Sequence, residues 1–409
     1  MTAILFRNAR IVEPASGVTP ADLLVEDRTV SAIGPNLAAP EGARIIDANG
    51  RMLAPGLVDC GPFRADVEAC AAGGITHAIL MPDQSPPLDE PALVERAERL
   101  GKPTLWVRPL AAATQGLKGR RMAEIGLLQE AGAVGVATGR AAIADAAVML
   151  RLLRYAAGLG LVTVAHAEDP GLTAGAVATE GDYATRLGLA AAPAIAEAMQ
   201  VARDLRLAQE AGAAIHFACI TTAEAIALIR AAQAQGQDVS AGTTPEAFML
   251  NETAVSGYRS FARLSPPLRA ESDRLAVRDG LADGTITIIA SRHDPRTAEE
   301  KRQPFADAEP GAAGAATLLA LSLTLVHDGL LPMHRLLELL SLAPARRFGL
   351  EAGSLAPGKP ADLLLFRPDA PWRIDSGQLP GKGGNTPFDG LPVMGRIDML
   401  LKGGEVVFG

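Results

Sequence analysis

Short apolar runs alternate with amphipathic helical patterns along the chain between Gly56 and Gly349. Continuous apolar runs indicate buried strands, whereas apolar residues spaced three and four apart indicate helices that pack on one face. The predicted strands are residues 57–60, 76–81, 104–110, 133–138, 162–167, 214–220, 239–243 and 285–291. The predicted helices are residues 91–100, 122–131, 143–159, 195–211, 222–235, 272–281, 316–327 and 334–342. Strand and helix recurring eight times, with glycine at most of the joins, predict an α/β fold of the (β/α)8 TIM-barrel type.

The two flanks of this pattern are β-rich. Residues 4–12, 23–33 and 43–52 precede the barrel, and residues 361–366 and 397–408 follow it. Turn signals such as Ala48-Asn49-Gly50 separate these stretches. We therefore predict a small composite β-sandwich domain built from residues 1–54 and 351–409, with the barrel, residues 55–350, inserted between its two parts.

Composition narrows the class of protein. The chain has 409 residues, of which 48% are hydrophobic and only 4% aromatic, so Ala, Leu, Val and Ile must fill the core. The formal net charge of -8 argues against a nucleic-acid partner or an anionic membrane surface. There is no signal-peptide pattern at the start, and the longest apolar run, residues 312–326, is too short to span a bilayer. With only three cysteines and no CxxC spacing, the sequence favours a cytoplasmic protein.

Barrel enzymes place their chemistry at the carboxyl ends of the strands, so we examined those positions for reactive side chains. Strand one is followed by Gly61, Pro62, Phe63 and Arg64, none of which is a metal ligand. Asp83 follows strand two, where capping of the turn is the favoured role and binding of a polar ligand the alternative. The later strands end in further polar residues, namely His166, Glu168, Asp169, Cys219, Ser291, Arg292, His293 and Asp294.

Few of the six histidines of the chain are placed where they could bind a metal ion. We expect His216, within strand six, to be buried and hydrogen-bonded. His166, Cys219 and His293 remain as potential ligands, and they are loosely placed. A zinc site needs three or four converging ligands, so the sequence predicts no bound metal and no cofactor.

Several motifs, taken in order and spacing, resemble dihydroorotase, the cyclic amidohydrolase of pyrimidine synthesis. They extend through essentially the whole chain. They are Ala71-Ala72-Gly73-Gly74-Ile75-Thr76, Met81-Pro82, Gly116-Leu117-Lys118-Gly119, Ala165-His166-Ala167-Glu168-Asp169, Pro266-Pro267-Leu268-Arg269, Leu281-Ala282-Asp283-Gly284-Thr285-Ile286 and Asn385-Thr386-Pro387-Phe388. The resemblance implies a barrel whose divalent metals generate the hydroxide that attacks a cyclic amide.

The departures from the family pattern fall on its metal positions. The resemblance implies paired histidines after strand one, but this chain has Gly61 and Phe63 there, or a gap. Strand four, at residues 136–139, supplies no bridging ligand. His166 matches the strand-five ligand, and Cys219 stands at the histidine position of strand six. Only vestigial ligands, His166 and Cys219, therefore remain.

Residues implied in catalysis and substrate binding differ as well. Arg292 stands where the family has its catalytic aspartate, Ser265 where it has an asparagine, and Asp83 where it has a substrate-binding asparagine. No intact catalytic residue is left. We expect Arg292 to replace the lost metal charge by pairing with Glu168, Asp169, Asp83 or Asp294 across a metal-free pocket.

A retained scaffold without its ligands resembles the non-catalytic members of this family, which serve as structural partners of aspartate carbamoyltransferase. This is the leading hypothesis, and it leaves a homo-oligomer open. One alternative is an active divergent hydrolase with a rebuilt single-zinc site that uses His166, Cys219 and His293. The other is a small-anion-binding protein that uses Arg64, Arg269 and Arg292.

Overall fold

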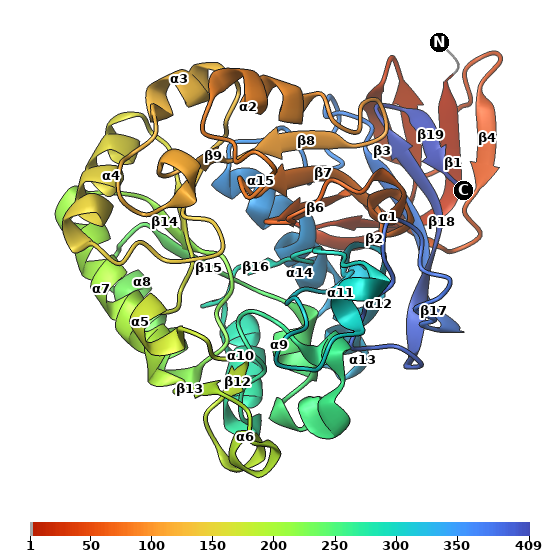
Figure 1. Cartoon of the computed structure of the whole chain (residues 1–409). Coiled ribbons are helices and arrows are strands. Elements are labelled where there is room, and N and C mark those ends of the chain that lie inside the picture. The colour runs from red at the N-terminus through yellow and green to blue at the C-terminus, as the bar shows by residue number, and fades with distance from the viewer. Residues whose placement is uncertain (1–2) are drawn as a thin grey trace.

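The computed structural model describes residues 3–409, and the two ends of the chain meet in one β-rich sheet (Figure 1). The strand order is β19-β18-β17-β5-β1-β2-β3, and β4 also pairs with β1. The strands are β1 (Ile4–Glu13), β2 (Gly17–Glu26), β3 (Thr29–Gly34), β4 (Arg44–Asp47), β5 (Met52–Pro55), β17 (Leu363–Arg373), β18 (Pro392–Lys402) and β19 (Glu405–Phe408). The predicted stretch 23–33 is thus two strands, because Asp27 and Arg28 form a turn at positive φ of 46° and 69°.

This sheet curls over its own core. The amide of Val30 in β3 donates to Lys359 O at 2.9 Å, and Val30 O accepts from the amide of Gly358, just before β17, at 2.8 Å. Alternate side chains such as Phe6, Leu23, Leu53 and Leu363 are fully buried between the two sides of the curl. The predicted β domain built from both termini is confirmed.

Between these flanks, eight parallel strands follow one another around a barrel. They are β6 (Leu57–Cys60), β7 (Ile75–Leu80), β8 (Trp106–Pro109) with its continuation β9 (Ala111–Ala112), β10 (Val136–Ala137), β11 (Thr163–Ala165), β14 (Ile215–Phe217), β15 (Val239–Thr243) and β16 (Ile288–Ile289). Strand three bridges two ladders, because β8 pairs with β7 and β9 pairs with β10.

The seam between the last and first strands is closed mainly by a buried carboxylate. Asp59 in β6 accepts a hydrogen bond from the Ser291 amide at 2.8 Å and another from the Ser291 hydroxyl. Beyond it, the Phe63 amide donates to His293 O at 2.9 Å. The predicted TIM-barrel fold is confirmed.

Helices surround the barrel largely where the pattern predicted them. The longer ones are α2 (Pro91–Glu98), α3 (Ile125–Glu130), α4 (Ala146–Gly158), α7 (Ile195–Ala211), α8 (Ala223–Ala234) and α10 (Glu271–Asp283). The shorter ones are α1 (Val67–Ala72), α5 (Pro170–Thr173), α6 (Asp182–Leu187), α9 (Pro245–Met249), α11 (Ala298–Lys301), α12 (Leu318–Ser322), α13 (Thr324–His327), α14 (Met333–Leu337) and α15 (Ala343–Arg347). Glu338–Leu342 is π-helical, and β12 (Ala178–Thr179) pairs with β13 (Ala191–Ala192) outside the barrel.

The helix predicted over residues 316–327 is broken in the structure. It consists of the 3-10 turn Ala315–Thr317 followed by α12 and α13. The hydroxyl of Thr324 donates to Leu321 O at 2.6 Å, and a side-chain bond of this kind competes with the helical ladder. Within residues 3–409, no helix is both long and apolar enough to cross a bilayer.

Candidate functional site

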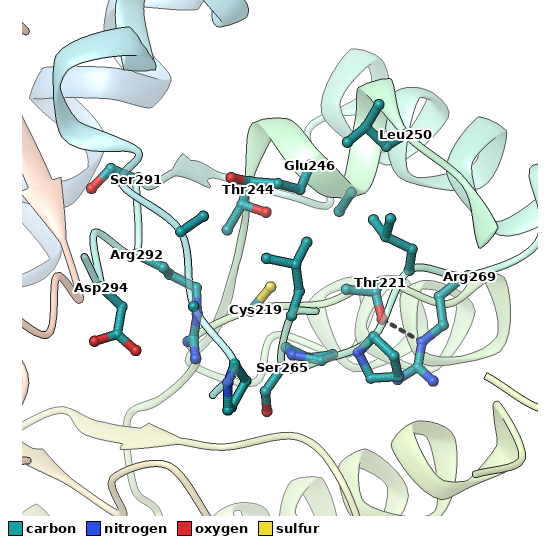
Figure 2. Close-up of a pocket in the computed structure, with 18 of the residues that line it drawn as sticks. Cys219, Thr221, Thr244, Glu246, Leu250, Ser265, Arg269, Ser291, Arg292 and Asp294 are labelled. Carbon is teal, nitrogen blue, oxygen red and sulfur yellow. Dashed lines mark hydrogen bonds between the residues drawn. The ribbon is translucent and has the colours of Figure 1, made fainter. Parts of the chain in front are cut away.

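Two neighbouring cavities lie at the carboxyl ends of the barrel strands. The first, of about 650 Å³, is lined by residues from strands six, seven and eight and from the 264–269 loop (Figure 2). The second, of about 570 Å³, contains His166 and Glu168 in its wall. Both cavities share Arg140 and Ser265. The position that catalytic barrels use for chemistry is therefore hollow in this protein.

A phenylalanine stands where the paired histidines are expected. Phe63 is 2% exposed, and its ring lies 3.7 Å from the Arg140 guanidinium carbon and 5.0 Å from that of Arg292. These contacts are in the range of cation–π interactions. Arg64, expected to contribute to an anion pocket, lines neither cavity. The first strand thus ends in an apolar platform for two arginines.

Arg140 is a site residue that the sequence reasoning missed. It follows Gly139 directly after strand four, and its Nη1 lies 2.6 Å from Asp294 Oδ2. Its backbone amide donates to Asp83 Oδ1 at 3.0 Å. Asp83 therefore fixes the loop after strand four, a variant of the turn-stabilising role favoured for it. An arginine one residue beyond the strand-four glycine was the signal that could have revealed this cluster.

A buried ion network lies between the two cavities around Arg269. Its Nη2 is 2.7 Å from Glu168 Oε1 and 3.5 Å from Glu197 Oε2, and its Nε donates to the Thr221 hydroxyl at 2.9 Å. Burial opposes ionisation of Glu168, but the hydrogen bond from His166 and the charge of Arg269 lower the pKa of this carboxyl to about 2. Burial raises the pKa of Glu197. The charge of Arg269 is thus paired with buried carboxylates of the protein itself.

The three potential metal ligands do not converge. His166 Nε2 lies 3.5 Å from Glu168 Oε2 and lines the second cavity, whereas Cys219 lines the first. Burial raises the pKa of the Cys219 thiol to about 12, so the neutral thiol is favoured at neutral pH. His293 lines neither cavity, since its Nδ1 accepts from the Ala315 amide at 3.2 Å and its Nε2 lies 3.7 Å from Asp66 Oδ2.

The remaining histidine of strand six is structural, as expected. His216 is buried and its Nδ1 lies 2.9 Å from the Ser240 hydroxyl. Burial lowers its pKa to about 3. In the part of the chain that the structure describes, residues 3–409, no three His, Cys, Asp or Glu side chains are grouped so that they could hold a metal ion. The residues at the barrel mouth therefore do not fit the metal centre that the family resemblance implies.

The expected pairing of Arg292 with a carboxylate is wrong. Among residues 3–409, no carboxylate oxygen lies within 4.0 Å of its guanidinium; Asp294 instead binds Arg140 and Arg296, the latter at 2.7 Å. Arg292 has a φ of 43°, and its side chain extends toward the first cavity, between Asp294 and Cys219 in Figure 2. Asp294 was one of the four carboxylates expected to pair with Arg292, and it pairs with two other arginines instead. Ser265, at the former asparagine position, lines both cavities.

Comparison with known proteins gives consistent results. A family model described as dihydro-orotase-like matches residues 50–225. Curated proteins named dihydroorotase from Pelobacter propionicus and Syntrophus aciditrophicus are 38% and 37% identical to the chain, over 99% of it and 99% of each relative.

Solved structures of cyclic amidohydrolases are also similar. The L-hydantoinase (dihydropyrimidinase) from Arthrobacter aurescens has a TM-score of 0.87 at 28% identity and covers 100% of this chain and 96% of its own. A dihydropyrimidinase from Brevibacillus agri NCHU1002 has a TM-score of 0.85 at 22% identity, over 99% of this chain and 95% of its own, and supports the fold alone.

Proposed function

This chain belongs to the dihydroorotase family of pyrimidine biosynthesis, and from that premise we propose that it is a non-catalytic member that acts as a structural partner of aspartate carbamoyltransferase. The observation that carries the proposal is the side-chain content of the barrel mouth. Phe63 and Cys219 stand where the family resemblance implies histidine ligands of the metal, after strands one and six. Arg292 stands where it implies the catalytic aspartate.

The electrostatics of the mouth support the same proposal. The guanidinium groups of Arg140 and Arg292 both lie against the ring of Phe63, between the ends of strands one, four and eight. A divalent cation placed there would be repelled by both groups, and Coulomb repulsion between close charges is strong away from bulk water. We therefore propose that the protein works without zinc or another cofactor.

The rebuilt single-zinc hydrolase receives no support from the geometry. His166 and Cys219 line different cavities, and His293 is held by Ala315 and Asp66. A zinc ion requires its ligands within about 2.0–2.3 Å of one point. The loops would have to rearrange before these three side chains could share a metal.

Metal analysis combined with a dihydroorotase assay tests the catalytic part of the proposal. We expect purified protein to contain no stoichiometric zinc and to neither hydrolyse nor form dihydroorotate above background, because the metal-bound hydroxide and the proton-shuttling aspartate both lack their residues. One zinc ion per chain that survives dialysis against a weak chelator, together with turnover abolished by His166→Ala, would show an active enzyme instead.

The partner and the compartment are proposals of the same kind. The chain matches a curated relative over 99% of that protein's length. Its residues at the barrel mouth differ from those that the family resemblance implies, and a retained scaffold with different mouth residues is consistent with a role in assembly. Cys60, Cys70 and Cys219 are all free and buried. Free buried thiols are typical of proteins in a reducing compartment, and we propose a cytoplasmic location.

A further inference from the structure

We propose that the first mouth cavity binds a small organic carboxylate and that the guanidinium of Arg292 is its anchor. This inference concerns a ligand of the chain itself, and it holds whether or not the chain assembles with a partner enzyme. It rests on the charge balance of the cavity wall, on the direction of one side chain and on the remaining lining.

Four arginines line this cavity, and three of them already have carboxylate partners. Arg140 binds Asp294, Arg269 binds Glu168, and Arg274 binds Glu271 with an Nε–Oε2 distance of 2.8 Å. Arg292 differs, because among residues 3–409 no carboxylate oxygen lies within 4.0 Å of it. The cavity therefore contains one cation whose charge the protein does not neutralise by a direct contact.

The backbone directs this cation into the cavity. Arg292 has a φ of 43°, a left-handed conformation that costs free energy for a residue with a side chain. Its side chain leaves strand eight toward the interior of the cavity in Figure 2, and it is only partly exposed. Phe63 supports it from one side, and Arg140, a like charge, lies on the same ring. An anion between them would offset this repulsion.

The acidic groups in the same wall do not supply that anion. Asp294 is held by Arg140 and Arg296. Glu246, in α9 after strand seven, is 7% exposed; burial raises its pKa, and the charge of Arg292 acts in the opposite direction without a direct contact. Cys219 is favoured as the neutral thiol. Among residues 3–409, no carboxylate therefore neutralises the guanidinium of Arg292 by a direct contact.

The chemistry of the lining suggests the ligand class. A guanidinium presents a planar pair of N–H donors that matches a carboxylate in a bidentate geometry. The wall of the same cavity also contains the apolar side chains of Leu250, Leu264 and Ala312 and the hydroxyls of Thr244 and Ser265. The fit is to a compact carboxylate with a partly apolar body.

The test is a titration of the intact chain with benzoate and succinate by calorimetry, with benzamide as the uncharged analogue. We expect saturable binding of at least one carboxylate and none of benzamide. Arg292→Gln should weaken that binding at least about tenfold, which corresponds to ~1.4 kcal/mol, and Arg292→Lys should restore part of it. Arg206→Gln is the matched control, because Arg206 is an exposed arginine on α7 that lines neither cavity.

Three results would overturn the proposal. The first is the absence of saturable binding of both carboxylates up to about 20 mM, a concentration range that would reveal even weak binding. The second is equal binding by Arg292→Gln protein that keeps the wild-type circular dichroism spectrum. The third is equal binding of benzamide. None of these measurements depends on catalytic activity or on a partner protein, so failure here is distinguishable from failure of the proposed function.

Discussion

Arg269 and Arg292 line the same cavity, yet their contributions to stability should differ greatly. Arg269 is 3% exposed and lies between Glu168 and Glu197, so its removal leaves two buried carboxylates without their cation. Breaking a buried ion pair on one side typically costs about 3 kcal/mol or more. We expect Arg269→Met to lower the free energy of unfolding by at least this amount in urea denaturation.

The matched variant is Arg292→Met in the same assay. Arg292 has no carboxylate within 4.0 Å among residues 3–409, so its loss should change the free energy of unfolding by less than about 1 kcal/mol. Equal destabilisation by the two substitutions would contradict this assignment of roles.

Glu168 should make stability depend on pH in the acid range. Its pKa in the folded chain is about 2, against an ordinary value of 4.5, because His166 and Arg269 stabilise the carboxylate more than burial disfavours it. The stabilisation is present above pH 4.5 and is lost as the pH falls toward 2, since the unfolded chain then binds the proton more readily.

Urea denaturation at pH 6 and pH 3 measures this effect. Wild type should lose more free energy of unfolding between the two pH values than Glu168→Gln does. Glu224→Gln, at an exposed position on α8, serves as the control and should behave like wild type. If Glu168→Gln lost as much stability as wild type on acidification, Glu168 would not be the group responsible.

Single residues show where sequence reasoning succeeds at the mouth and where it stops. Cys219 and Arg292 were placed at strand ends by counting strands, and Ser265 was singled out by the family resemblance; all three line the first cavity. The absence of a carboxylate partner for Arg292 could not be found this way, because Asp294 pairs with two other arginines, Arg140 and Arg296, whose directions depend on loop conformation. Which side chains come together at the barrel mouth depends on the conformation of the folded loops.

At the scale of elements, Lys301 connects two loops beside the mouth cavities. Its Nζ donates to Ser260 O at 3.1 Å, Arg263 O at 3.3 Å and Glu309 O at 2.7 Å, and Lys301 is 4% exposed. One ammonium group thus joins the 3-10 turn Ser260–Ala262 to the segment that follows α11. The connection between these two segments beside the cavities therefore depends on the Lys301 side chain.

Lys301→Met should loosen this connection while keeping the length of the side chain. The carbonyls of Ser260, Arg263 and Glu309 would lose this donor; Ser260 and Arg263 are partly buried and Glu309 is exposed, so water can replace the donor at Glu309 more easily than at the other two. We expect faster hydrogen exchange in residues 259–264 and 308–312 and unchanged exchange in β7 on the opposite side of the barrel. Uniformly faster exchange would instead indicate global destabilisation.

The long elements followed from hydrophobic period, whereas short ones did not. Strands β6 and β15 and helix α7 lie where the apolar pattern predicts them, because fully buried strands and one-sided helices leave clear signals. Helix α1, of six residues, was missed. The helix predicted over residues 316–327 is interrupted near Thr324, whereas the one predicted over residues 334–342 continues through a π-helical turn into α15.

For the whole molecule, the family and the fold follow from dispersed motifs, because such motifs mark turns and strand ends that the barrel requires. A role in assembly does not follow from them, since one fold supports many functions. The chain has a buried core of ordinary barrel type, while among residues 3–409 no three potential metal ligands are grouped together. Selection on an outer surface would produce this combination, and that possibility is open to a direct experiment.

We expect the chain to form a stable complex with the aspartate carbamoyltransferase of its own organism. The measurement is co-expression followed by size-exclusion chromatography with light scattering at micromolar concentrations, where both chains should elute together ahead of either one alone. The chain run alone reports whether it forms a homo-oligomer. Because the net charge of -8 could hold a basic protein nonspecifically, the run is repeated at about 0.5 M salt, which screens such attraction within a few ångströms. A specific interface of sufficient apolar area should survive this salt, whereas separate elution in both buffers would count against the structural role.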